Sequence, residues 1–225
     1  MATQAGCAVD ERLIHLLRHL GIAQAHFAGC MGRDVAELAA SRPDVVSSLT
    51  LVCPWGLKIA ALRPVSSRLL LVTGDQGQPA QEVHRAATGL PGARLINLRD
   101  YFSPLWADVI ADRGTEVGAT MMKFLSDIDP QHTMQEAPLE AEGEIADLSY
   151  SIRGSGPPLV LLPLGLAPSQ WEPLIPSLSE RYCTISVTGP ALGMVAFLEA
   201  PRPGISANRA QSGKRGRPAP RAERA

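Results

Sequence analysis

The chain has 225 residues, of which 45% are apolar and 19% charged, and its net charge is −1. This length suits one domain, or one domain with extensions, around a sizeable core. No apolar run approaches the roughly 20 residues of a transmembrane helix, and residues 1–8 lack the features of a signal peptide, so we expect a cytoplasmic protein without membrane contacts. The charge is uneven: residues 201–225 hold seven Lys or Arg against one acid, so the remainder is acidic.

The four cysteines are Cys7, Cys30, Cys53 and Cys183. They lie far apart, with no CxxC spacing and no histidine at ligand spacing, which excludes a dense disulfide framework and a zinc site. We therefore expect no metal and no cofactor, and at least three of the thiols to be plain buried side chains.

Residues 1–128 alternate between helical and strand patterns. Apolar residues at helical spacing predict helices over 10–20, 33–41, 80–88 and 106–125. Short apolar runs predict buried strands over 23–29, 45–53, 68–73 and 93–98. Strands that alternate with helices indicate a mostly parallel α/β sheet.

The rest of the chain divides into a linker, a second α/β segment and a tail. Residues 129–146 are rich in Pro and Glu and predict a linker. Residues 147–199 resume the alternation, with strands over 147–153, 159–162 and 182–187 and a helix over 169–181. In residues 200–225 Pro, Arg, Gly and Ala dominate, so we expect a disordered basic tail.

The most specific local motif is Ala28-Gly29-Cys30-Met31-Gly32, between a predicted strand and a predicted helix. A nucleophile on a sharp, strained turn needs small neighbours two residues before and after it. The following helix N-terminus and the amide of Met31 would stabilise a developing oxyanion. The motif thus predicts a nucleophile elbow at Cys30; the alternative is a buried cysteine in a Gly-rich turn.

Residues 13–128 resemble the rear half of the α/β-hydrolase fold. The similar segments are Leu16-Leu17-Arg18-His19-Leu20-Gly21-Ile22, His26-Phe27-Ala28-Gly29-Cys30-Met31-Gly32, Ser48-Leu49-Thr50-Leu51-Val52, Leu70-Leu71-Val72-Thr73-Gly74-Asp75 and Leu90-Pro91-Gly92-Ala93-Arg94-Leu95. The resemblance places Cys30 where that family usually has its nucleophilic serine. It also implies that an acid follows the strand ending near Asp75, the only acid of its loop.

Residues 147–199 resemble the front end of the same fold, notably Gly154-Ser155-Gly156-Pro157-Pro158-Leu159-Val160-Leu161-Leu162 and Trp171. The front follows the rear here, which implies either a circularly permuted hydrolase or a rear half followed by the opening of a second module. The latter arrangement is similar to bacterial hydrolase–methyltransferase fusions.

Packing favours the permuted arrangement, because either half alone would expose a long apolar strand edge. We therefore predict a three-layer α/β-hydrolase-like parallel sheet. Its strands are predicted in the spatial order 182–187, 159–162, 25–29, 48–53, 68–73, 93–98.

The catalytic partners that the resemblance implies are largely missing. The family's base is a histidine after the last strand, but residues 98–104 contain none. The five histidines are His15, His19, His26, His84 and His132, for which a solvated or core-packed role is expected; His84 is the least implausible substitute base. The oxyanion strand is followed by Pro163-Leu164-Gly165, where proline removes a backbone donor and leaves Gly165 as the second donor. Trp55 and Trp106 could line the rim of a pocket or pack against the core.

These patterns predict a hydrolase of small ester-like substrates with Cys30 as nucleophile, Met31 and Gly165 as oxyanion donors and Asp75 as a polar partner, its activity weak or lost. The alternatives are a catalytically inactive hydrolase-like module that binds a small molecule or a protein, and a truncated fragment of a fusion. In the tail, Gly213-Lys214-Arg215-Gly216-Arg217-Pro218 resembles an AT-hook. So short a match in biased sequence arises easily by chance, so we expect a solvated tail and no nucleic-acid partner.

Overall fold

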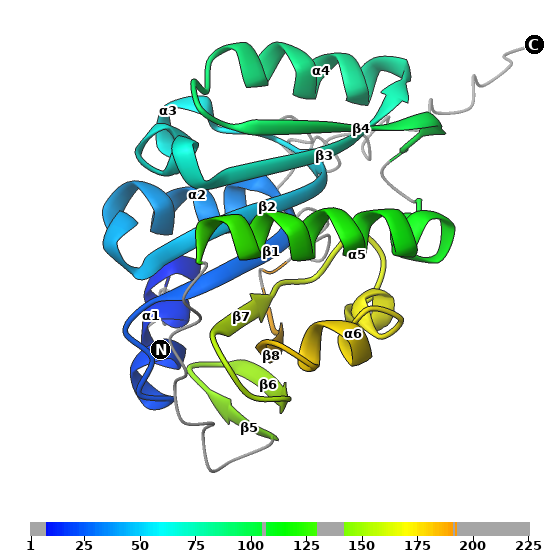
Figure 1. The fold of residues 1–225 in the computed structure, drawn as a ribbon. Coiled ribbons are helices and arrows are strands. Elements are labelled where there is room, and N and C mark those ends of the chain that lie inside the picture. The colour runs from blue at the N-terminus through cyan, green and yellow to red at the C-terminus, as the bar shows by residue number, and fades with distance from the viewer. Residues whose placement is uncertain (1–7, 105–106, 130–141, 191, 193–225) are drawn as a thin grey trace, which may run out of the picture.

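A computed structural model of the chain describes residues 8–104, 107–129, 142–190 and 192. It contains an eight-stranded sheet in the order β4-β3-β2-β1-β7-β8-β6-β5 (Figure 1). The strands are β1 (Ala25–Met31), β2 (Val46–Trp55), β3 (Leu69–Gln76), β4 (Arg94–Phe102), β5 (Glu142–Ile145), β6 (Leu148–Arg153), β7 (Pro158–Leu161) and β8 (Cys183–Thr188). All neighbours from β4 to β8 are parallel, whereas β6 pairs antiparallel with both β8 and β5.

Helices cover both faces of the sheet and make the predicted three layers (Figure 1). The helices are α1 (Val9–His19), α2 (Gly32–Ser41), α3 (Ile59–Leu62), α4 (Gly77–Thr88), α5 (Val109–Ile128) and α6 (Ile175–Ser179), with 3-10 turns η1 (Pro43–Val45), η2 (Arg63–Arg68) and η3 (Pro168–Trp171). Helices α1 to α4 pack on one apolar core cluster, and α5, η3 and α6 pack on a second one. The sheet separates these two clusters.

The first helix shows how local sequence sets this packing. Leu13, Leu16 and Leu17 recur at helical spacing on one face of α1 and are buried. Acidic residues in its first turn and basic residues in its last complement the helix dipole. The helix therefore forms with one apolar face that the sheet covers.

The two predicted halves join in one sheet, as predicted. Strand β1 pairs with β7 in the register His26↔Leu159, Phe27↔Val160 and Ala28↔Leu161, and the Leu162 amide donates to the Ala28 carbonyl at 2.8 Å. The parallel strands, from β4 at the edge of the sheet to β8, have the order predicted from the α/β-hydrolase resemblance. The predicted order of the parallel strands, with both segments of the chain in one sheet, is therefore confirmed.

A buried arginine adds a polar link between the halves. From α1, Arg12 donates Nε to Ala146 O at 2.9 Å, Nη1 to Pro190 O at 2.5 Å and Nη2 to Asp147 O at 3.0 Å. These acceptors lie in the β5–β6 turn and just after β8. One side chain of the first segment thus satisfies three backbone carbonyls of the second.

Several predicted elements differ from the structure by a few residues at their ends, and two differences have a clear physical cause. The helix predicted over 169–181 is split into η3 and α6, because Pro173 and Pro176 cannot donate the hydrogen bonds that an uninterrupted helix requires. Residues 142–145, predicted as the end of the linker, form β5, because the turn at Ala146 and Asp147 folds them back onto β6. Residues 130–141 and the tail over 200–225 lie outside the described part.

Candidate functional site

Cys30 lies near the end of β1 and is buried. It lines a cavity of about 20 Å³ at the carboxyl ends of the parallel strands. The lining residues are Cys30, Val52, Cys53, Trp55, Pro104, Ala107, Val109, Leu164 and Gly165. A space of this size holds about one water molecule.

The backbone at this edge is strained at a different cysteine from the one predicted. Strand β1 runs to Met31 and α2 begins at Gly32, so the predicted passage from strand to helix is present. The non-glycine residues with positive φ in the described part are Cys53, Asp100, Ala146 and Asp147. The left-handed residue of this cavity is therefore Cys53, with φ 46°, and not Cys30.

The two predicted oxyanion donors, Met31 and Gly165, lie at different places relative to Cys30. Gly165 lines the cavity with Cys30, and Met31 follows Cys30 as the last residue of β1. The Cys30 Sγ atom lies 4.0 Å from the carbonyl oxygen of Pro163, a long contact to an acceptor. The donor roles of Met31 and Gly165 stay predictions.

Asp75 sits near the end of β3, and it does not line the Cys30 cavity. Its carboxylate accepts hydrogen bonds from the backbone amides of Asp100, at 3.0 Å, and Tyr101, at 3.1 Å. These bonds, the one from Asp100 above all, lower the pKa of Asp75 below its ordinary value. Asp75 is exposed and holds the last residues of β4 in place, while its predicted catalytic role stays untested.

The histidines lie in other environments. His84 is on α4, which packs on the core cluster opposite the one that contains Cys30, and its Nε2 lies 2.8 Å from Asn97 Oδ1. His26 is buried, with Nδ1 2.8 Å from Ser48 Oγ, and His19 Nε2 lies 3.1 Å from Tyr150 Oη. No histidine of the described part lines the Cys30 cavity. His132 lies outside the described residues.

Cys53 is the residue that sequence reasoning passed over. Burial raises the pKa of its thiol to about 11, and the Ser103 hydroxyl and the Gly74 backbone offset only part of this effect. Ser103 Oγ is buried and makes no hydrogen bond of ordinary geometry, although it lies close enough to Cys53 to influence that thiol. Its position in the sequence could have indicated that it lies near Cys30, because Cys53 is the last residue of an apolar strand predicted beside the strand that carries Cys30.

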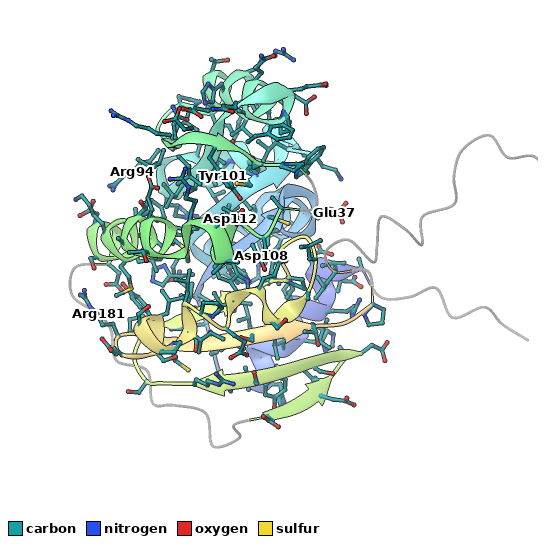
Figure 2. The ribbon with its side chains drawn as sticks, turned by 90° about the vertical axis from the view of Figure 1, so that its right-hand side faces the viewer. Glu37, Arg94, Tyr101, Asp108, Asp112 and Arg181 are labelled. Atoms are coloured by element: carbon teal, nitrogen blue, oxygen red, sulfur yellow. The ribbon has the colours of Figure 1, made fainter. Side chains whose placement is uncertain are left out.

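The N-terminal end of α5 borders this region. Figure 2 shows Tyr101 and Asp112 side by side there, and Tyr101 Oη donates to Asp112 Oδ2 at 2.9 Å. The Arg113 guanidinium stacks 5.5 Å from the centre of the Tyr101 ring. Trp55 lines the cavity, as predicted for the rim, whereas Trp106 lies outside the described residues. No group of three or more His, Cys, Asp or Glu side chains in the described part could hold a metal ion.

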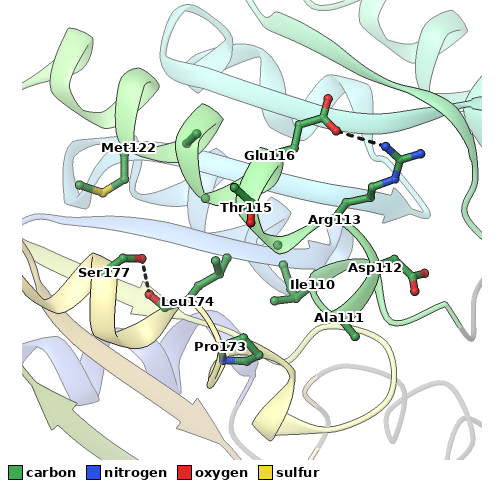
Figure 3. Close-up of a pocket in the computed structure, with 13 residues that line it drawn as sticks. Ile110, Ala111, Asp112, Arg113, Thr115, Glu116, Met122, Pro173, Leu174 and Ser177 are labelled. Carbon is green, nitrogen blue, oxygen red and sulfur yellow. Dashed lines mark hydrogen bonds and ion pairs between the residues drawn. The ribbon is translucent and has the colours of Figure 1, made fainter.

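A larger groove of about 690 Å³ lies between α5 and the η3–α6 segment (Figure 3). Ile110, Met122 and Leu174 give it an apolar floor, and Arg113 and Glu116 form an ion pair at 3.5 Å beside it. Helix α5 is kinked at Arg113, whose φ of −137° departs from helical geometry. This groove is separate from the Cys30 cavity, with which it shares no lining residue.

Among solved structures, the chain is similar to a predicted CIB-like hydrolase from Thermoplasma acidophilum, with 21% sequence identity and a TM-score of 0.47. The similarity covers 53% of this chain and 58% of that one. An enol-lactonase from Burkholderia xenovorans LB400 aligns with 15% identity and a TM-score of 0.42 over 56% of this chain and 75% of that one. No protein-family model matches, and neither does any curated protein.

No helix in the described ranges has both the length and the apolar character needed to span a bilayer.

Proposed function

We propose that this chain is an α/β-hydrolase-like protein in which hydrolysis of small ester-like substrates at Cys30 is weak or lost. The observation that carries the proposal is the cavity around Cys30. Among the described residues that line it, none is His, Asp or Glu, and its volume is about 20 Å³. Small-molecule sites usually enclose roughly 300 to 1,000 Å³.

The chemistry of acyl transfer explains why these features limit the rate. A thiol attacks as the thiolate, and an adjacent base normally removes its proton and later protonates the leaving group. Loss of the base in a catalytic triad costs roughly 10⁴-fold or more in rate. The Pro163 carbonyl beside Cys30 is an acceptor, so it supplies neither a base of suitable strength nor an oxyanion donor.

The test is hydrolysis of p-nitrophenyl acetate by the full chain, recorded from the first seconds. We expect at most a burst of one equivalent and no steady turnover above buffer. Cys30→Ala should abolish the burst, and Cys183→Ala, which removes a thiol on β8, should retain it. Steady turnover that Cys30→Ala removes and Cys183→Ala retains would contradict the proposal.

A second candidate function is small-ligand binding in the groove between α5 and η3–α6. Its volume of about 690 Å³ lies in the usual range for such sites. A ligand found by fragment screening should raise the melting temperature of the wild type. It should have no effect on Thr115→Trp, which fills the groove, while Lys123→Trp, outside the lining, should behave as wild type.

A further inference from the structure

Two thiols from adjacent strands share the small cavity at the carboxyl end of the sheet. Cys30 and Cys53 both line it, and both pack with the core cluster beneath α5 and α6. Cys183, the third cysteine in the described part, lies on β8 and belongs to the cluster on the opposite face. Among the described cysteines, Cys30 and Cys53 lie together at this cavity. Cys183 lies elsewhere in the same chain and therefore serves as a control.

The register of β1 and β2 places the two cysteines on adjacent strands, near the same level of the sheet. The strands are parallel neighbours, with Gly29 opposite Leu51 and Met31 opposite Trp55. Cys30 is the one β1 residue between these pairs, so it faces the bulged stretch 52–54 of β2. Neighbouring strands lie about 4.8 Å apart, and disulfides join Cα atoms about 4.4 to 6.8 Å apart. The strands need not separate for a bond to form.

The bulge also places the second thiol on the same face of the sheet as the first. Val52 and Cys53 are consecutive, yet both contact the cluster on the α5 side of the sheet. In a regular strand, consecutive side chains point to opposite faces. The left-handed backbone at Cys53, φ 46°, accompanies this departure and places its side chain on the same face as Cys30.

We propose that Cys30 and Cys53 are an oxidative modification site, at which a hydroperoxide converts the two thiols into a disulfide that joins β1 to β2. Cys53 is half-buried and Cys30 is buried, so the oxidant meets Cys53 first. Because burial raises the pKa of Cys53 to about 11, its thiolate is scarce at neutral pH, so this first step is slow there and becomes faster as pH rises. The thiolate that forms by losing a proton to solvent attacks the O–O bond of hydrogen peroxide and becomes a sulfenic acid, releasing hydroxide.

The Cys30 thiolate then attacks the sulfenyl sulfur. The S–S bond forms, the S–O bond breaks and a second hydroxide leaves, and the two thiol protons convert both hydroxides to water. The pair of thiols loses two electrons, and one peroxide is reduced to two water molecules. The reaction needs no ester substrate and no base from the protein, because the released hydroxides take up the two thiol protons, so it is independent of whether Cys30 hydrolyses anything. Its consequence is that oxidation removes the free thiol at Cys30.

The experiment treats the full chain with hydrogen peroxide, unfolds it in excess N-ethylmaleimide and measures intact mass and a peptide map. We expect the wild type to lose two of its four maleimide labels and 2 Da, with the lost thiols mapped to a peptide pair joining Cys30 to Cys53. Cys183→Ala should form the same link. Cys30→Ala and Cys53→Ala should lose it while keeping a wild-type circular dichroism spectrum.

A wild-type map without the Cys30–Cys53 link, or with links to Cys7 or Cys183 at equal yield, would overturn the proposal. The wild-type map decides this result even if an alanine variant fails to fold. Failure of the ester assay would leave the map unchanged, so the two proposals fail separately.

Discussion

The pairing of β1 with β7 and the carboxyl end of β1 lie within a few residues of each other, but their polar groups are satisfied very differently. Strand hydrogen bonds satisfy the backbone along the pairing, and a second link between the halves is made by Arg12, whose three donors satisfy carbonyls of the second segment. At the carboxyl end, Ser103 Oγ makes no hydrogen bond of ordinary geometry within the described part, Cys53 has a left-handed backbone, and the contact of Cys30 Sγ with the Pro163 carbonyl is long, at 4.0 Å.

This contrast separates what folding requires from what catalysis requires. Joining the halves removes two apolar strand edges from water, which stabilises the fold whatever the protein does. A working nucleophile additionally needs a base and oxyanion donors at defined positions. The strand pairing fulfils the first requirement, and the described residues around Cys30 lack the base of the second.

The largest expected effect comes from breaking the polar link between the halves. Arg12→Met keeps much of the buried volume but leaves the carbonyls of Ala146, Asp147 and Pro190 without their donor. We expect a loss of about 3 kcal/mol in the free energy of unfolding, measured by urea denaturation. Arg153→Met, which removes an exposed ion pair with Glu172, should cost less than about 1 kcal/mol. Equal losses in the free energy of unfolding for the two variants would show that the buried contacts of Arg12 stabilise the fold no more than an exposed ion pair does.

A smaller effect is expected where β3 and β4 approach each other. A Cβ atom at Gly74 would collide with the backbone carbonyl oxygen of Tyr101, which cannot move without disturbing β4. Gly74→Ala should therefore destabilise the protein by about 2 kcal/mol. Gly114→Ala is the control, because its Cβ would meet Ile110 only at 3.4 Å. If Gly74→Ala left the free energy of unfolding unchanged, β3 and β4 would be able to rearrange at this point without cost.

The thiol of Cys53 predicts a loss of stability at alkaline pH. Burial raises its pKa to about 11, from an ordinary value of 9.0. Between these values the unfolded chain releases the proton and the folded chain keeps it, so stability falls as pH rises. The total loss attributable to this group is on the order of 2 kcal/mol.

The measurement is the free energy of unfolding of wild type and Cys53→Ala from pH 8 to 11, in reducing buffer. Taking the difference between the two proteins cancels the titration of lysines and tyrosines. As pH rises, the free energy of unfolding of the wild type should fall more than that of Cys53→Ala. A difference independent of pH would show that the thiol is not effectively buried.

The smallest effect concerns the origin of the lowered pKa at Asp75. Backbone amides cause most of it, whereas the pKa of Asp44 is lowered chiefly by its hydrogen bond to the Arg42 side chain. Salt screens exposed charge pairs more than hydrogen bonds to backbone amides. In carbon-detected NMR titrations, 1 M salt should therefore move the midpoint of Asp44 toward 3.8 more than that of Asp75. The reverse order would contradict this assignment.

Much of the fold could be predicted because apolar runs and glycine turns are local signals. The buried strands around Leu49 and Val160 and the helix of Leu13 and Leu17 appear directly in the pattern. Their order across the sheet required the family resemblance. The break of the helix predicted over 169–181 was signalled by Pro173 and Pro176, but apolar periodicity outweighed the prolines in the prediction.

The site was less predictable, because its features depend on tertiary contacts. The local motif pointed to Cys30 and the family resemblance to Gly165, but the left-handed backbone of Cys53 arises from a bulge that no residue type announces. Asp75, predicted in the loop after the strand over 68–73, lies inside β3, one residue before its end. Its bonds to the amides of Asp100 and Tyr101 depend on how β4 ends, which the sequence does not specify.

The two segments of the chain fold as one sheet through the pairing of β1 with β7. Native-state hydrogen exchange tests it most directly, by comparing amides of Phe27 and Ala28 with those of Val160 and Leu161 in rising denaturant. We predict that all four exchange only through global unfolding, with one common opening free energy and denaturant dependence. Exchange of Val160 and Leu161 through a smaller opening that leaves Phe27 and Ala28 protected would contradict the account.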